Sequence, residues 1–312
     1  MTRVLTNILA SAAALLLTAV PATAQIGVRA STAAETQADE PIVVQGQRRE
    51  IAKALRKLIT PTDSEQLARF EDEVCPIVIG MPKDWTATLT RMIRNNVVAV
   101  GGKVGKPGCT VNAAVIFIDQ PLELIQAFAK EEPGFFNMTP RELAKFTAVQ
   151  RPVASWHVTD TRGRDGEELG SVRSIVDPGS GARLPADSSA KVTRGVTTGR
   201  LVSPVREDML VGFVVFDRMA TPGKSLRQLA DLATMHLLLD INPEASTRDP
   251  GSILSLFEPA AAGVTPPPRL SRFDRGTLRG FYTQRENNRS ARQQAENIAK
   301  AIEKGAGEEP QR

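Results

Sequence analysis

The sequence predicts an α+β fold, in which a mixed sheet is flanked by helices, and two adjacent stretches carry this prediction. Residues 211–217 form an almost uninterrupted apolar run, which indicates a strand covered on both faces of its sheet. Residues 225–239 follow as a nearly all-apolar helix with Ser225 as its N-cap, and such a helix is enclosed by its neighbours. We therefore expect one domain over residues 65–283, organised around this strand and helix.

The elements before this centre follow from the same periodicity and from turn residues. One predicted helix places Trp85 and Leu89 on the same apolar face. Gly, Ser, Asp and Pro dominate residues 166–200, which suggests a long hairpin or an excursion of the chain. The predicted strands are 75–80, 111–118, 153–158 and 199–205, and the predicted helices are 49–58, 83–100, 121–130 and 139–149.

After the central helix, residues 271–282 form an amphipathic helix with Phe273, Leu278 and Phe281 to bury. Residues 284–312 are highly polar, so we expect a solvated helix that frays into a disordered tail.

The chain begins with a secretory signal over residues 1–24. Arg3 precedes an apolar run over residues 8–20, and Ala22 and Ala24 supply the small residues of a cleavage site. A membrane anchor is the alternative, but the run is shorter than the roughly 20 residues that a span needs. No later apolar segment is longer, so we expect a periplasmic or secreted mature chain without a membrane span.

Composition argues against a nucleic-acid partner. The formal net charge is +4 and aromatic residues make up 4% of the chain, so neither a strongly basic surface nor stacking platforms are predicted.

The two cysteines, Cys75 and Cys109, each lie next to a predicted strand start. In an oxidising compartment an even count favours a disulfide between them, and two buried free thiols are the alternative.

Residues 25–64 are expected to form a flexible leader with a short basic helix. Part of this leader, 42–48, resembles the TonB box of TonB-dependent outer-membrane receptors, where an extended segment adds a strand to the periplasmic energy-transducing protein. The resemblance implies an envelope protein as partner, although Gln45 stands where those receptors have Thr. An edge strand or linker is the other interpretation. The residues that carry the resemblance are Ile42, Val43, Val44, Gly46 and Arg48.

The central strand and helix, with residues 249–257 and 273–282, resemble the C-terminal half of secreted bacterial proteins related to the zincin metalloproteases. In that family the central helix carries His-Glu-x-x-His, two zinc ligands one turn apart with the general base between them. The resemblance implies a zincin-like fold and places Asp231, Leu232 and Met235 at the motif positions. Leu232 cannot act as a base and Met235 is a poor zinc ligand, so the resemblance implies a zinc site that has been lost, with no metal or cofactor.

Other residues offer an alternative site. His236 and Asp240 are spaced i,i+4 on the central helix, and His157 on a strand could approach them to bind a metal. A structural hydrogen bond between His236 and Asp240 is the plainer interpretation. Asp119 and Asp217, each ending a buried strand, either form a carboxylate pair or cap the elements that follow.

These patterns predict an exported, non-catalytic binding or scaffold protein. A divergent metallohydrolase that uses His157, His236 and Asp240 is the alternative. A serine hydrolase is not supported, because the sequence contains no Gly-x-Ser-x-Gly motif.

Overall fold

The computed structural model describes residues 40–171, 191–192, 203–245, 251–258 and 265–308. The predicted signal peptide and most of the predicted long hairpin lie outside these residues. Within the ranges that the structure covers, no helix combines the length and the apolar character needed to cross a bilayer.

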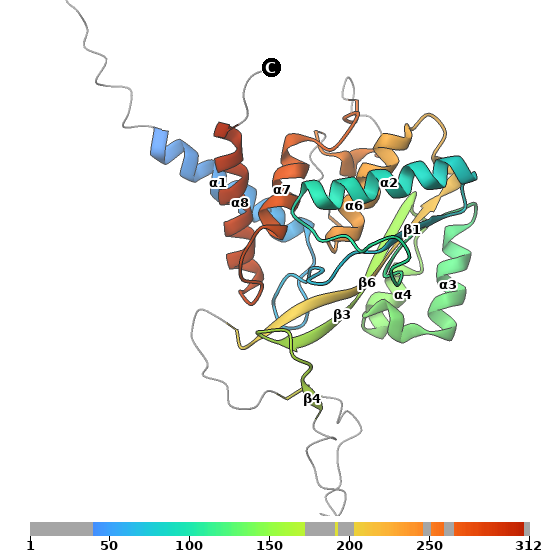
Figure 1. The fold of residues 1–312 in the computed structure, drawn as a ribbon, viewed down its shortest axis with the longest axis horizontal. Helices are drawn as coiled ribbons and strands as arrows, with labels where there is room; N and C mark the ends of the chain where they lie inside the picture. The colour runs from blue at the N-terminus through green and yellow to red at the C-terminus, as the bar shows by residue number, and fades with distance from the viewer. Residues whose placement is uncertain (1–39, 172–190, 193–202, 246–250, 259–264, 309–312) are drawn as a thin grey trace, which may run out of the picture. The chain divides into compact units, whose positions relative to one another are not determined.

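A four-stranded mixed sheet lies at the centre of the fold, which confirms the predicted α+β class (Figure 1). Strands β1, β2 and β6 run parallel, and β3 pairs antiparallel with β6 at one edge. Val214, Val215 and Phe216 in β6 have no exposed surface, as a strand covered on both faces requires. The order across the sheet is β1 (Pro76–Ile79), β2 (Ala113–Ile118), β6 (Val205–Asp217) and β3 (Val153–Gly163). A separate short ladder joins β4 (Gly170–Ser171) and β5 (Lys191–Val192).

One face of the sheet is covered by α2 and α6, which pack on each other, while α7 and a short 3-10 helix, η3, pack against α6. Their apolar side chains and those of the sheet form the larger hydrophobic core. The bounds of these elements are α2 (Lys83–Ala99), α6 (Leu226–Leu238), η3 (Ile253–Ser255) and α7 (Arg272–Tyr282).

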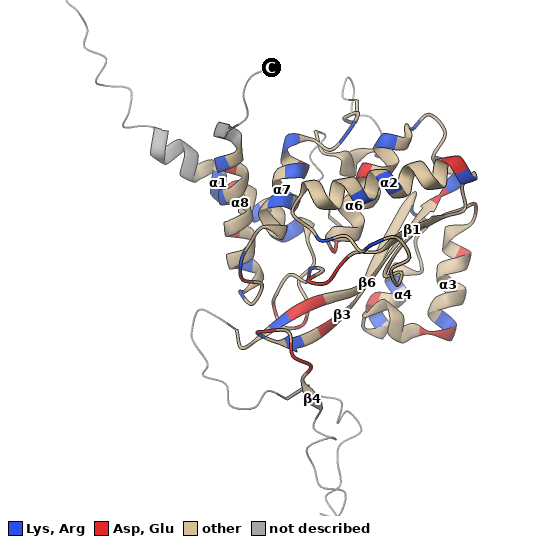
Figure 2. Cartoon of the chain, viewed as in Figure 1, with Lys and Arg blue, Asp and Glu red and all other residues tan. Residues whose placement is uncertain are grey.

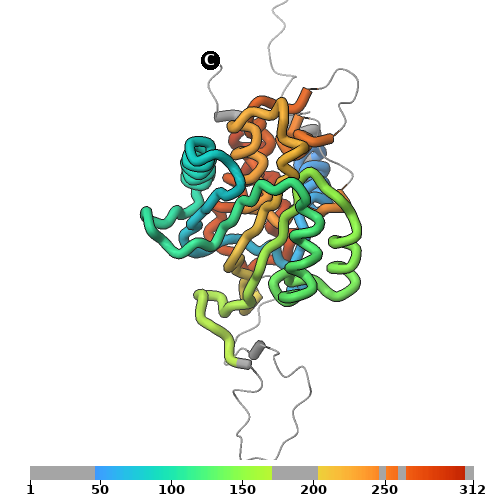
Figure 3. Tube along the Cα trace, turned by 90° about the vertical axis from the view of Figure 1, so that its right-hand side faces the viewer, coloured from blue at the N-terminus to red at the C-terminus, as the bar shows by residue number. Residues whose placement is uncertain are grey.

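The opposite face is covered by α3 (Pro121–Glu131), the 3-10 helix η1 (Pro133–Phe136) and α4 (Pro140–Phe146). Figure 3 shows α2 and the pair α3 and α4 on opposite sides of the strands. Trp156 of β3 is the centre of a smaller aromatic core on this face, because its ring stacks 4.8 Å from Phe136 and 4.9 Å from Phe213. The two-sided cover explains why the central strand β6 reads as a continuous apolar run.

The N-terminal helix α1 (Glu40–Leu58) begins earlier than predicted. It includes residues 42–48, for which an extended peptide was expected, so the structure differs from the prediction at this segment. The physical reason lies further along the helix, where Ala52, Leu55 and Leu58 recur at helical spacing and are buried in the core. A helix docked in this way can extend towards its N-terminus, since its nucleus is already formed.

The C-terminal helix α8 (Ala291–Glu308) is less solvated than its polar sequence predicts. Ala295, Ile298 and Ala299 are fully buried, and α8 packs closely on α7. Gly280 of α7 permits this approach, because a Cβ there would lie 3.0 Å from Cβ of Ala301. Two alanines and one isoleucine in a polar helix are thus enough to make one buried face.

Candidate functional site

The helix that carries the degenerate zinc-motif positions, α6, is part of the core. Ser225 begins it with a capping box, in which its hydroxyl accepts a hydrogen bond from the backbone N–H of Gln228. Leu232 and Met235 have no exposed surface, and neither faces an open cleft. Met235 and Leu232 therefore act as packing residues, as their chemistry suggests.

Asp231, the third motif position, is a fully buried carboxylate whose acceptor sites are used within the protein. The amide of Asn96 donates to its Oδ1 at 2.8 Å, and the guanidinium of Arg227 donates to its Oδ2 at 3.0 Å. The backbone N–H of Leu270 also donates to Oδ2, at 2.7 Å. Asp231 thus links α2, α6 and the start of α7, and removing it would cost roughly 3 kcal/mol by leaving buried donors without acceptors.

The alternative trio of His157, His236 and Asp240 does not meet at one point. His236 Nδ1 lies 2.8 Å from the hydroxyl of Ser155, whereas His157 Nε2 lies 3.0 Å from the carbonyl oxygen of Leu237. Asp240 lies beside the other histidine, with its Oδ1 3.7 Å from Nδ1 of His157.

The expected hydrogen bond between His236 and Asp240 is therefore replaced by a contact between Asp240 and His157. The reason is that α6 ends at Leu238 and Leu239 is extended, with φ −133°, so Asp240 is not one helical turn beyond His236. Among the residues that the structure describes, no three His, Cys, Asp or Glu side chains are grouped to hold a metal.

Asp119 and Asp217 lie at the same edge of the sheet, since Ile118 is in register with Asp217. Asp119 does not pair with Asp217 but accepts two hydrogen bonds from the guanidinium of Arg218, at 2.6 and 2.5 Å. These bonds hold the pKa of the Asp119 carboxyl below its usual value. Asp217 accepts from the backbone N–H of Met219 at 2.9 Å, which confirms the capping interpretation for this residue.

A crevice of about 940 Å³ opens beyond the carboxyl ends of β1 and β6, and we call it the carboxyl-end crevice. Ligands of open α/β sheets bind at this edge, because the loops that follow parallel strands meet there. Trp85, predicted to be on the buried face of α2, is instead 49% exposed and forms one wall. The lining residues are Gly80, Met81, Pro82, Trp85, Arg218, Thr221, Pro222, Gly223, Lys224, Leu226 and Leu229.

Gly80, on one side of this crevice, occupies a position that requires glycine. Gly80 has φ +87°, and a Cβ there would lie 1.9 Å from the carbonyl oxygen of Phe117. Only glycine therefore fits at this position, where the backbone passes close to β2 after the end of β1 and turns towards α2.

The opposite end of β6 carries buried charges (Figure 2). Asp208 accepts two hydrogen bonds from Arg206, both at 2.9 Å, and Glu207 accepts one from the hydroxyl of Thr161 at 2.8 Å. Burial raises the pKa of the Glu207 and Asp208 carboxyls, although Arg206 partly offsets this effect at Asp208. A cavity of about 570 Å³ lies beside them, and the described residues that line it are all polar or charged: Arg69, Glu71, Arg164, Asp165, Arg206, Arg285, Glu286, Asn287 and Asn288.

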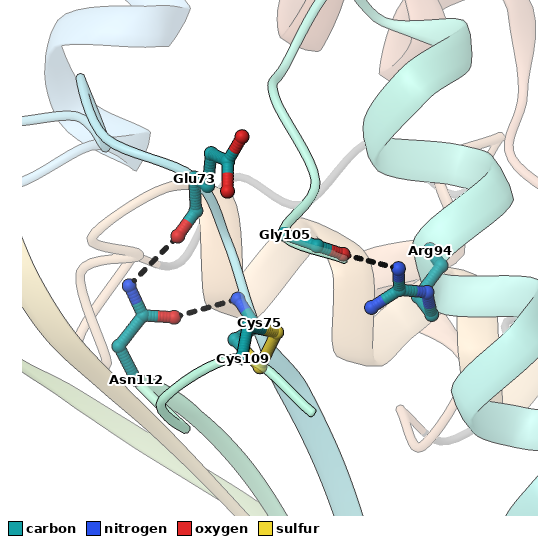
Figure 4. Close-up of a disulfide and its surroundings, with 6 residues drawn as sticks. All are labelled: Glu73, Cys75, Arg94, Gly105, Cys109 and Asn112. Carbon is teal, nitrogen blue, oxygen red and sulfur yellow. Dashed lines mark hydrogen bonds between the residues drawn. A yellow bond between two sulfur atoms is a disulfide. The ribbon is translucent and has the colours of Figure 1, made fainter. Parts of the chain in front are cut away.

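The predicted disulfide is confirmed: Cys75 and Cys109 are bonded, with Cα atoms 6.0 Å apart (Figure 4). It joins the segment before β1 to the loop before β2. Asn112 supports the junction, since its amide donates to the carbonyl oxygen of Glu73 at 3.0 Å while its Oδ1 accepts from the N–H of Cys75 at 2.7 Å.

Comparison with protein-family models, with curated proteins and with solved structures gives no match to this chain.

Proposed function

We propose that this chain is an exported, non-catalytic binding or scaffold protein on a zincin-like fold, whose metal-site helix has become a core helix. The observation that carries the proposal is the complete burial of Asp231, Leu232 and Met235 on α6. A hydrolytic zinc site needs an open coordination position and a polar base beside it. The corresponding positions here are filled by packing and by the hydrogen bonds of Asp231.

The alternative, a divergent metallohydrolase, requires His157, His236 and Asp240 to converge on one ion. Imidazole ligands bind zinc at about 2.0–2.1 Å, so their free nitrogens must point to a common centre. Here His236 is held by Ser155 and His157 by the Leu237 carbonyl, from two different elements. This division of partners favours a structural role for both histidines.

Export is the second part of the proposal. The disulfide between Cys75 and Cys109 is compatible with an oxidising compartment, in which such bonds persist. Together with the signal-like residues 1–24, it supports a periplasmic or secreted location.

The third part concerns an envelope partner engaged by residues 42–48. Strand addition would require the first turns of α1 to unwind, because these residues are helical in the structure. Deleting 42–48 should remove the partner from a pull-down of envelope extract while the melting temperature stays unchanged, since the docked residues of α1 remain. Deletion of residues 31–37 serves as the length-matched control. Identical partners for both deletions would remove this segment from the proposal.

The decisive experiment for the non-catalytic proposal is zinc analysis of protein purified from the periplasm without chelator. We expect far less than one zinc per chain, with the same value for His157→Gln and His236→Gln. One zinc per chain that is lost in either variant, at an unchanged melting temperature, would reinstate the hydrolase.

A further inference from the structure

We propose that the carboxyl-end crevice binds a small amphiphilic anion, with an apolar body against Trp85 and one anionic group at Lys224. This assignment rests on the binding function proposed above and gives it a ligand class.

The walls of the crevice are apolar and come from two turns and the helices that follow them. Met81 and Pro82 lie between β1 and α2, and Trp85 lies in the first turn of α2. The other wall has Pro222, between β6 and α6, and Leu226, the first residue of α6. The volume of about 940 Å³ lies within the range of small-molecule pockets, about 300–1,000 Å³. Such a concave apolar surface can bury most of a small ligand, and the exposed indole of Trp85 can supply much of the contact area.

Among the described residues that line the crevice, the charged ones are Arg218 and Lys224, and none is a carboxylate. Arg218 is already engaged by Asp119 through two hydrogen bonds. The ammonium of Lys224 lies 5.7 Å from the ring centre of Phe257 and forms no ion pair with any carboxylate in the part of the chain that the structure describes.

Lys224 is therefore the cation that a ligand can engage. It is partly buried, so a charge-assisted hydrogen bond there is stronger than one in bulk water. The positive pair Arg218 and Lys224 disfavours a cationic ligand. Of these two cations in the described lining, Arg218 is already paired with Asp119, so Lys224 is the one left for an anionic group.

An apolar wall and one available cation together select a monoanion with an apolar body. Fatty-acid-like carboxylates and aromatic carboxylates share this chemistry. The polar cavity at the other end of β6 lacks the apolar wall, because none of its described lining residues is apolar.

The test is calorimetric titration of the mature, disulfide-bonded protein with decanoate and with 2-naphthoate, each to about 1 mM. The opposite-charge controls are decyltrimethylammonium and 2-naphthylmethylammonium, which keep the apolar bodies. We expect at least one anion to bind and its cationic counterpart to bind at least about tenfold more weakly. Binding of decanoate alone assigns an aliphatic ligand, and binding of 2-naphthoate alone assigns an aromatic one.

Variants place the binding at the crevice. Lys224→Met should weaken the anion about tenfold, and Lys224→Arg should restore most of the affinity. Trp85→Ala should weaken both anions. Lys83→Met is the matched control, because Lys83 is an exposed lysine beside the crevice that does not line it. The affinity of this variant for the anion should stay within about twofold of wild type.

Equal binding of anions and cations, or an equal loss in Lys83→Met and Lys224→Met, would overturn the assignment. If neither anion binds, the assignment is also overturned. If neither anion binds but the zinc content stays far below one per chain, the non-catalytic proposal stands and only the ligand class is rejected.

Discussion

The two ends of strand β6 carry the same pairing, an arginine that donates two hydrogen bonds to an aspartate, in opposite surroundings. At the carboxyl end, both side chains of Arg218 and Asp119 are nearly half exposed. At the amino end, the side chain of Asp208 is 6% exposed beneath Arg206. The pKa of Asp119 is lowered because the hydrogen bond to Arg218 dominates, whereas that of Asp208 is raised because burial dominates. Solvent exposure of the carboxyl, rather than the arginine partner, thus determines whether its pKa is raised or lowered.

The sheet is also fastened differently at its two ends. The disulfide and the Asn112 hydrogen bonds lie where β1 and β2 begin, while the crevice opens beyond the carboxyl ends of the strands. The amino ends are thus cross-linked and polar inside, and the carboxyl ends are open and apolar. This division leaves room for a ligand at the end where the chain is less constrained.

The largest effect is expected from the covalent link. Replacing Cys75 and Cys109 together by Ala should lower the free energy of unfolding by about 4 kcal/mol, because the bond closes a loop across a sequence separation of 34. Urea unfolding followed by circular dichroism measures this change. A loss below about 1 kcal/mol would mean that the amino ends are held mainly by their packing.

A matched pair of variants tests the two ion pairs directly. Arg206→Met should cost about 2 kcal/mol at neutral pH, since it leaves Asp208 as a buried carboxylate without its counter-ion. Arg218→Met should change stability much less than Arg206→Met, because exposed pairs contribute little. Equal losses in the two variants, measured by urea unfolding, would break the comparison between the ends.

The smallest and most specific effects are pH-dependent. The folded-state pKa of Glu207 is raised above its ordinary value of 4.5 by burial, so its carboxyl favours folding below that pH and loses this contribution as pH rises through the folded pKa. Glu207→Gln should therefore gain stability relative to wild type as pH rises from about 4 to 7.

Asp119 should show the opposite sign. Its folded-state pKa is lowered below 3.8, so it contributes stability above that value and loses it as pH falls through the folded pKa. The difference between wild type and Asp119→Asn should shrink on acidification below 3.8. Thermal unfolding across this range checks both variants, and parallel pH profiles for the two would contradict the assignment of opposite environments.

Continuous apolar patterns allowed the centre of the fold to be predicted from sequence. Val214, Val215 and Phe216 of the central strand and residues 229–238 of the central helix are buried, so periodicity and burial agree for these residues. The disulfide followed from an even cysteine count. The elements that pack against α6 could not be predicted from the sequence, because they depend on the order of the strands in the sheet.

The crevice could not be predicted because its two walls are far apart in sequence. Gly80 and Lys224 meet only because β2 lies between β1 and β6 in the sheet, and local patterns do not specify that order. Trp85 has the helical spacing of the buried Leu89, yet it lies in the first turn of α2, beyond the end of the sheet that would cover it. The contact between His157 and Asp240 was missed because it depends on where α6 ends.

Exposed residues usually tolerate substitution, but Gly80 is exposed and should not. It is exposed at the rim of the crevice, yet any side chain there would collide with the backbone of Phe117 at 1.9 Å and would also have to adopt φ +87°. A saturation library selected for folding should thus keep glycine at position 80 as strictly as it keeps apolar residues in the core. Neighbouring Trp85 should vary freely under that selection and become fixed only when ligand binding is selected as well.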